Sequence, residues 1–141
     1  MKESTWNECI ESGDASPRSP NVQKAKSLMM IAQGRLKFLT AQQKTQENVN
    51  YIFEGYYASL LEFLHALLVK KGYKVDNHIC LGYYLRDVLR EDDIFRDFDD
   101  CRTKRNALVY YGELMPFDIA CQAIERSKVL MQKIEALYAV L

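Results

Sequence analysis

The sequence contains little of what metal sites are built from, with only two histidines and four cysteines in 141 residues. The cysteines are Cys9, Cys80, Cys101 and Cys121, and no two of them have the two-residue spacing that is typical of zinc sites. The acidic run at residues 91–93 fits the first turn of a helix, where the macrodipole favours carboxylates. We therefore predict no metal and no cofactor.

The chain also lacks an excess of charge of either sign. Lys and Arg total 19, and Asp and Glu total 19. A balanced chain has no overall field that draws it to nucleic acid or to an anionic membrane surface. Any surface that binds phosphate must therefore be local.

A signal-peptide pattern and a long uninterrupted apolar run are both missing, because Glu62 and His65 break the longest run. These absences predict a cytoplasmic protein with reduced thiols and no membrane partner. Cys101 and Cys121 fall on apolar faces and are expected to be small core residues. Cys9 is expected in a mobile tail.

No segment alternates apolar and polar residues, and no Asn-Gly or Asp-Gly turn joins two β-branched runs, so no strands are expected. The length is that of one domain. Breakers and small polar residues predict a flexible leader over residues 1–19, followed by a helical domain over residues 20–141. The predicted fold class is all-α, an up-and-down antiparallel bundle of four to five helices.

Capping residues and apolar stripes at helical spacing mark five helices. The second is expected to end at Gly72 and the fourth at Gly112, since glycine after the last turn is a common helix end. The five helices are expected to begin at Ser19-Pro20, near Glu47, at Asn77, at Asp92 or Asp93, and at Pro116.

One charged residue falls where the fourth helix should present an apolar side chain. Phe98, Cys101, Arg105 and Leu108 recur at three- and four-residue steps, which is the spacing of a single buried stripe. A guanidinium keeps its proton, so its burial is costly without a partner. We infer that Arg105 faces a partner helix, a second subunit or an anionic ligand.

The order of several motifs resembles a known family. The second helix carries Tyr56-Tyr57-Ala58, His65-Ala66-Leu67-Leu68 and Lys71-Gly72-Tyr73, and His78, Leu81, the Arg102–Asn106 segment and Tyr110 follow it. This order resembles the HEPN domain, a small helical bundle often encoded beside a minimal nucleotidyltransferase in prokaryotes. The resemblance covers residues 22–139.

The resemblance implies a homodimer with a cleft that holds an Arg, usually a polar residue after it, and a His several residues further on. Many such proteins are metal-independent ribonucleases. Arg105 matches the motif Arg and Asn106 its polar neighbour, whereas Tyr110, Tyr111 and Gly112 occupy the places where the His should stand.

The missing His bears on catalysis. Cleavage of RNA without metal needs a base that removes the proton of the 2′-hydroxyl, and tyrosine, with a pKa of ~10, is a poor base at neutral pH. Loss of such a group costs roughly 10²- to 10⁴-fold in rate. Tyr110 is instead expected to line the cleft, through a hydrogen bond to phosphate or by stacking on a base.

These observations predict a HEPN-type protein of a prokaryotic defence or toxin–antitoxin-like system, with weak or no nuclease activity. It binds RNA or a nucleotide at a dimer cleft or pairs with a nucleotidyltransferase. One alternative is an active endoribonuclease in which a His from elsewhere serves as the base. Another is a purely structural interaction module.

The same prediction names the site residues, and each of them also has a possible structural role. Arg105 has an ion pair as its alternative, with Asp97, Asp99, Asp100 or Glu113 as the acid. For Arg102 and Lys104 the alternative is a solvated helix face. His65 is expected to be packed or half-buried, and His78 to sit near a helix start. The predicted catalytic set is Arg105, Asn106 and Tyr110, and the predicted phosphate- or nucleic-acid-binding set is Arg102, Lys104, Arg105 and Tyr111.

Overall fold

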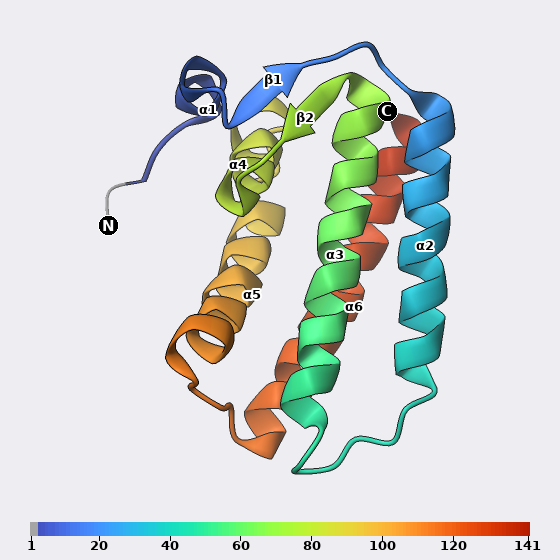
Figure 1. The fold of residues 1–141 in the computed structure, drawn as a ribbon, viewed down its shortest axis with the longest axis vertical. Coiled ribbons are helices and arrows are strands. Elements are labelled where there is room, and N and C mark those ends of the chain that lie inside the picture. The colour runs from blue at the N-terminus through green and yellow to red at the C-terminus, as the bar shows by residue number, and fades with distance from the viewer. Residues whose placement is uncertain (1–2) are drawn as a thin grey trace.

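The computed structural model describes residues 3–141, which form six α-helices and a small two-stranded sheet, with 75% of the chain helical (Figure 1). The predominantly helical fold predicted from the sequence is confirmed. A π-helical turn, η1 (Tyr84–Val88), continues the fourth α-helix. The other elements are α1 (Trp6–Ser12), β1 (Ala15–Pro17), α2 (Val22–Thr40), α3 (Val49–Lys71), β2 (Tyr73–Val75), α4 (His78–Tyr83), α5 (Asp92–Tyr111) and α6 (Phe117–Val140).

Helix α3 is the centre of the fold and packs against both α2 and α6, with α6 behind it in Figure 1. Its length and composition are sufficient for a membrane span, but 61% of its most apolar window is buried inside the protein. Phe53, Tyr56, Leu60 and Phe63 are all nearly inaccessible to solvent. The apolar character of α3 is therefore accounted for by packing within the fold.

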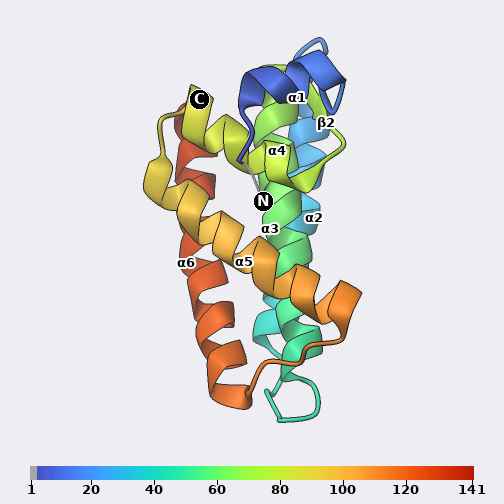
Figure 2. The same ribbon diagram turned by 90° about the vertical axis from the view of Figure 1, so that its left-hand side faces the viewer.

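Helix α5 crosses α3 and α6 at an angle (Figure 2). Helix α4 packs closely against α5 at Gly82. A Cβ atom at this position would lie 3.0 Å from ring carbons of Phe95 and Phe98, so only glycine leaves enough room. This contact joins α4 to α5. It also fixes the start of α4, which carries His78, beside the middle of α5.

The expected loose leader is wrong for the described part of residues 1–19. Trp6 of α1 is buried and packs edge-on against the rings of Tyr73 and Tyr84. The backbone N–H of Trp6 donates to Oδ2 of Asp87 at 2.8 Å. The breakers that suggested a tail instead form the turn after α1, where Gly13 adopts a φ of 84°.

Two of the thiols expected to be reduced are joined, since Cys9 of α1 and Cys80 of α4 form a disulfide. Cys9 is buried rather than placed in a mobile tail. Cys101 is a buried free thiol and Cys121 a half-buried one. Disulfides persist mainly in oxidising compartments, so the cytoplasmic location stays a prediction from sequence alone.

The expectation of no strands is also wrong. β1 and β2 pair antiparallel, with Ala15 opposite Val75 and Pro17 opposite Tyr73. Three-residue strands are too short to show a period of two, so no alternation of apolar and polar residues marks them in the sequence. The pairing brings the N-terminal segment against the end of α3.

Most helix ends agree with the capping signals. Asn77 caps α4 through its Oδ1, which accepts from the backbone N–H of Ile79, and α3 and α5 end at Gly72 and Gly112. The first long helix does not begin at Ser19-Pro20. It begins at Val22 after Asn21, whose side chain accepts from the backbone N–H of Lys24.

Candidate functional site

The guanidinium of Arg105 lies at the edge of the core, as the stripe on α5 predicts. Phe98, Cys101 and Leu108 of this stripe are buried, and Arg105 is half-buried. Its guanidinium carbon lies 5.5 Å from the centre of the Tyr57 ring and 5.7 Å from that of Tyr110. Aromatic faces are favourable surfaces for a guanidinium, so the cation is held without being neutralised.

Two of the four acids considered as partners for Arg105 are paired with other residues. Asp99 accepts from Arg102 at 2.8 Å, and Asp100 accepts from Lys104 at 2.5 Å and lies 3.3 Å from Arg126. Within residues 3–141, no carboxylate oxygen lies within 4.0 Å of an Arg105 nitrogen. The intramolecular ion pair considered for Arg105 is therefore not formed.

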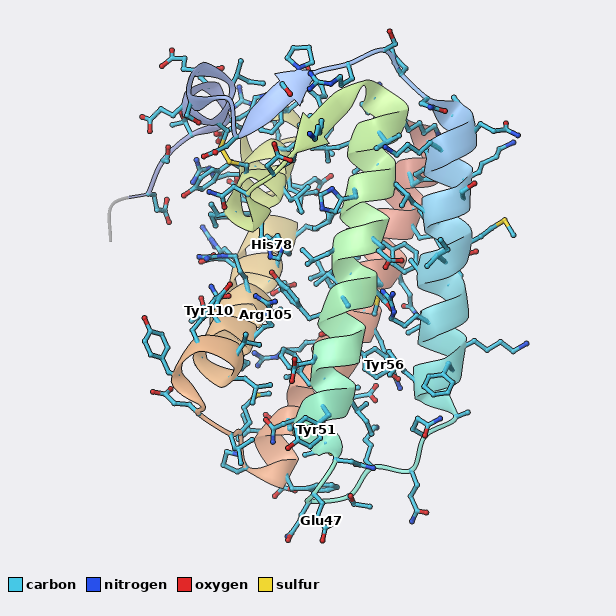
Figure 3. The ribbon with its side chains drawn as sticks, in the orientation of Figure 1. Glu47, Tyr51, Tyr56, His78, Arg105 and Tyr110 are labelled. Atoms are coloured by element: carbon cyan, nitrogen blue, oxygen red, sulfur yellow. A yellow bond between two sulfur atoms is a disulfide. The ribbon has the colours of Figure 1, made fainter. Side chains whose placement is uncertain are left out.

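Arg105 opens onto a hollow of about 350 Å³ between α5, the start of α4 and the turns that flank β1 and β2. We call this cavity the Arg105 hollow. Figure 3 shows His78, Arg105 and Tyr110 gathered around α5. The lining residues are Asp14, Asp76, Asn77, His78, Ile79, Arg102, Arg105, Asn106 and Tyr110.

His78, which the sequence analysis expected near a helix start, also lines the Arg105 hollow. It is the first residue of α4, and its Nδ1 lies 3.4 Å from the hydroxyl oxygen of Tyr57. Burial lowers the pKa of His78, and the positive charges of Arg105, His65 and Arg102 lower it further. A neutral imidazole can accept a proton at neutral pH.

Tyr57 of α3 contacts both Arg105 and His78. Its ring stacks on Phe98 at 6.3 Å and lies under the guanidinium of Arg105. Burial raises the pKa of the Tyr57 hydroxyl, against the opposing effect of the Arg105 charge. The hydroxyl therefore stays protonated and serves as a hydrogen-bond partner for His78. Sequence analysis identified Tyr57 only as part of the Tyr56-Tyr57-Ala58 motif.

The structure brings together four of the six residues predicted for the site: Arg102, Arg105, Asn106 and Tyr110. Nη1 of Arg105 lies 3.5 Å from Oδ1 of Asn106. The other two do not line the hollow. Lys104 pairs with Asp100, and Tyr111 is 77% exposed.

The charge of the Arg105 hollow is mixed. Arg102 is paired with Asp99, whereas Asp14 and Asp76 bring carboxylates to the opposite wall. The carbonyl oxygen of Asp14 accepts from the backbone N–H of Asp76 at 2.7 Å, which ties these two turns together. The hollow thus combines one cation without an ionic partner, a neutral imidazole and two acceptor groups.

Comparison with known proteins adds no assignment. Neither the protein-family models, nor the curated proteins, nor the solved structures gave a match to this chain. The resemblance to the HEPN domain therefore stays a prediction from the sequence, and the site must be interpreted from its own geometry.

Proposed function

We propose that the Arg105 hollow binds a phosphate group of RNA or of a nucleotide. The observation that supports this is the half-buried guanidinium that has no carboxylate partner in the described chain. Arginine presents a planar fork of donors that matches two phosphate oxygens. An incoming phosphate therefore supplies the ionic partner that the protein does not.

The rest of the lining favours a nucleotide over inorganic phosphate. The Tyr110 ring is 67% exposed beside Arg105, so its face is open to a base. Aromatic stacking contributes about 1–3 kcal/mol per base. Asp14 and Asp76 offer acceptors for amino groups of a base, but no favourable contact for a free anion.

A binding experiment tests this proposal. Fluorescence anisotropy with a labelled single-stranded RNA should show that Arg105→Ala weakens binding at least roughly tenfold, the effect of losing one charge-assisted hydrogen bond. Arg96→Ala is the matched control, because Arg96 lies on the same helix with its side chain 76% exposed. If both variants lost the same RNA affinity, the loss would reflect the change in net charge alone, and the proposal would be contradicted.

A second candidate function is cleavage of that RNA, and the placement of His78 supports it. With the imidazole neutral, Nε2 can take the proton of a 2′-hydroxyl as its oxygen attacks the phosphorus. The bond to the 5′-oxygen then breaks, the leaving oxygen takes a proton from solvent, and a 2′,3′-cyclic phosphate results. Arg105 would stabilise the charge that develops on the phosphorane.

The resemblance to the HEPN domain adds a homodimer to the proposal. Beside the Arg105 hollow, the end of α5 and the residues after it carry further exposed apolar side chains: Val109, Tyr111 and Leu114. A second copy placed on this surface would cover it and turn the hollow into a cleft. Sedimentation of the wild type as a dimer and of Leu114→Glu as a monomer would support this arrangement, and a monomeric wild type would overturn it.

From the same resemblance we propose a prokaryotic defence or toxin–antitoxin-like role, with a nucleotidyltransferase as partner. Its only support is the order of sequence motifs that ends in Arg105-Asn106. Co-purification of the protein with the product of an adjacent nucleotidyltransferase gene tests it, and a failure to associate at micromolar concentration contradicts it.

A further inference from the structure

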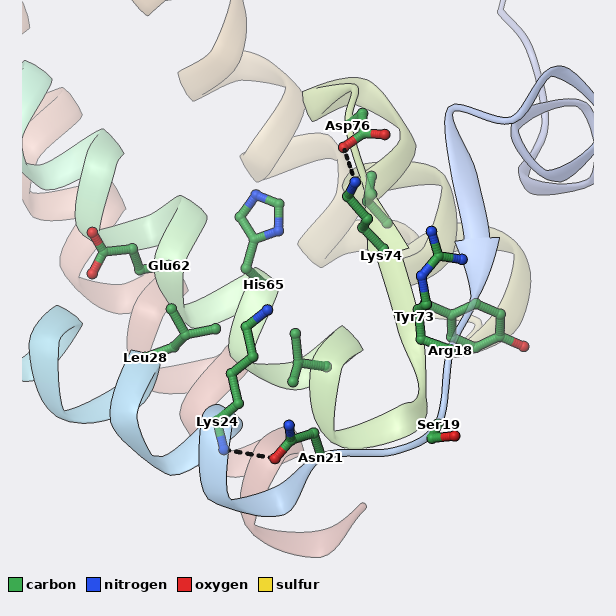
Figure 4. Close-up of a pocket in the computed structure, with 12 residues that line it drawn as sticks. Arg18, Ser19, Asn21, Lys24, Leu28, Glu62, His65, Tyr73, Lys74 and Asp76 are labelled. Carbon is green, nitrogen blue, oxygen red and sulfur yellow. Dashed lines mark hydrogen bonds and ion pairs between the residues drawn. The ribbon is translucent and has the colours of Figure 1, made fainter.

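A second and larger hollow, of about 650 Å³, lies between the start of α2, the last turns of α3 and β2 (Figure 4). We call it the His65 hollow. Its volume falls within the range of about 300–1,000 Å³ that is usual for small-molecule sites. Its lining residues are Arg18, Ser19, Asn21, Lys24, Leu28, Glu62, His65, Val69, Tyr73, Lys74, Val75 and Asp76.

The floor of the His65 hollow is apolar. Leu28 of α2 and Val69 of α3 are half-buried, and Val75 of β2 is 6% exposed. These side chains come from three different elements, so the hollow is a seam where helices and sheet meet. A ligand with an apolar body gains free energy by covering such a surface.

The rim of the His65 hollow is positive where α2 begins. Lys74 pairs with Asp76 at 3.8 Å, but in the described chain no carboxylate oxygen lies within 4.0 Å of the side-chain nitrogens of Arg18 or Lys24. The first turn of α2 has no acidic residue. Lys24 lies in the first turn of α2, at the positive end of the helix dipole, whereas Arg18 lies beside β1 (Figure 4). A cation without an ionic partner at the start of a helix favours an anion.

His65 of α3 lines the hollow, and Figure 4 shows its ring between Glu62 on one side and Lys74 on the other. Burial lowers its pKa, and Lys24 lowers it further against the opposing charges of Glu62 and Asp76. The ring is therefore neutral at neutral pH and supplies one donor and one acceptor without adding charge. Glu62 is engaged by Arg35 at 2.5 Å.

We propose that the His65 hollow binds a small molecule that carries one anionic group on an apolar body. The anionic group, a carboxylate or a phosphate ester, lies at Lys24 in the first turn of α2, and the body covers Leu28, Val69 and Val75. This site is separate from the Arg105 hollow and does not depend on the function proposed there.

Methyl NMR tests the proposal and locates the ligand. Titration with octanoate, as the carboxylate, and with AMP, as the phosphate ester, should shift the methyl signals of Leu28, Val69 and Val75 in a saturable way. Shifts with either probe support the proposal and identify which anion is bound. An absence of shifts with both probes overturns it.

A pair of charge variants on α2 provides the matched comparison. Lys24→Gln should weaken binding of the effective probe roughly tenfold, whereas Lys26→Gln, an exposed residue outside the hollow, should not change it. Equal affinities in the two variants would contradict the proposal. Arg105→Ala should leave these methyl shifts unchanged, so failure of this site is distinct from failure of the other.

Discussion

Nδ1 of His78 lies 3.4 Å from the hydroxyl oxygen of Tyr57. When the N–H of Nδ1 donates to this oxygen, Nε2 keeps its lone pair, which is the tautomer that a general base requires. In that arrangement the Tyr57 hydroxyl orients the imidazole of His78.

If His78 is the base, His78→Asn should reduce RNA cleavage by roughly 10²- to 10⁴-fold and leave RNA affinity nearly unchanged. Cleavage is measured with a fluorescent RNA in EDTA, and the cyclic phosphate product is identified by mass spectrometry. His65→Asn is the control, because His65 lines the other hollow. An inactive wild type would remove the ribonuclease candidate and leave the binding function standing.

Removal of the Arg105 charge should raise the pKa of His78, because that charge is the largest electrostatic cause of its lowering after burial. Titration of the imidazole signals by NMR in Arg105→Gln measures the change. The pKa of His78 should stay the same in Arg96→Gln. A pKa that also stayed unchanged in Arg105→Gln would contradict the placement of Arg105 and His78 in one hollow.

Stability should fall as the pH is lowered through about 6.5, the ordinary pKa of histidine. Both His65 and His78 have lowered pKa values in the folded protein, so the unfolded chain binds protons first. Their contribution to the free energy of unfolding is therefore complete above that pH and is lost below it. Urea unfolding at several pH values measures it, and His65→Gln should flatten the profile.

Gly82→Ala should lower the free energy of unfolding by about 1–3 kcal/mol, because the added Cβ atom overpacks the contact with Phe95 and Phe98. Gly34→Ala is the matched control on α2. Nothing lies within 4 Å of the position its Cβ would take, so it should stabilise the protein by about 0.5–1 kcal/mol. Urea unfolding of both variants distinguishes packing from helix propensity.

Loss of the disulfide in Cys80→Ser should lower the free energy of unfolding by about 4 kcal/mol, since the bond closes a loop over a sequence separation of 71 residues. Cys121→Ser, which removes a half-buried free thiol, should have a smaller effect. Dithiothreitol should destabilise the wild type and leave Cys80→Ser unaffected. An insensitive wild type would show that the bond does not form in solution.

The sequence predicted the parts of this fold that depend on local periodicity and capping. The long helices, the glycines at their ends and the inward placement of Arg105 all arise from spacing within one segment. The disulfide, the β1–β2 pair and the approach of His78 to Arg105 join distant segments. Such contacts depend on packing, which periodicity does not describe.

The residues on either side of β1 belong to different hollows. Asp14, just before β1, lines the Arg105 hollow, and Arg18, just after it, lines the His65 hollow. The backbone N–H of Arg18 donates to the carbonyl oxygen of Gly72 at 2.8 Å, and this bond holds the end of β1 against the end of α3. A single proteolytic cut after β1 would therefore alter the lining of both cavities at once, even though the Cys9–Cys80 disulfide would still hold the N-terminal piece to the rest of the protein.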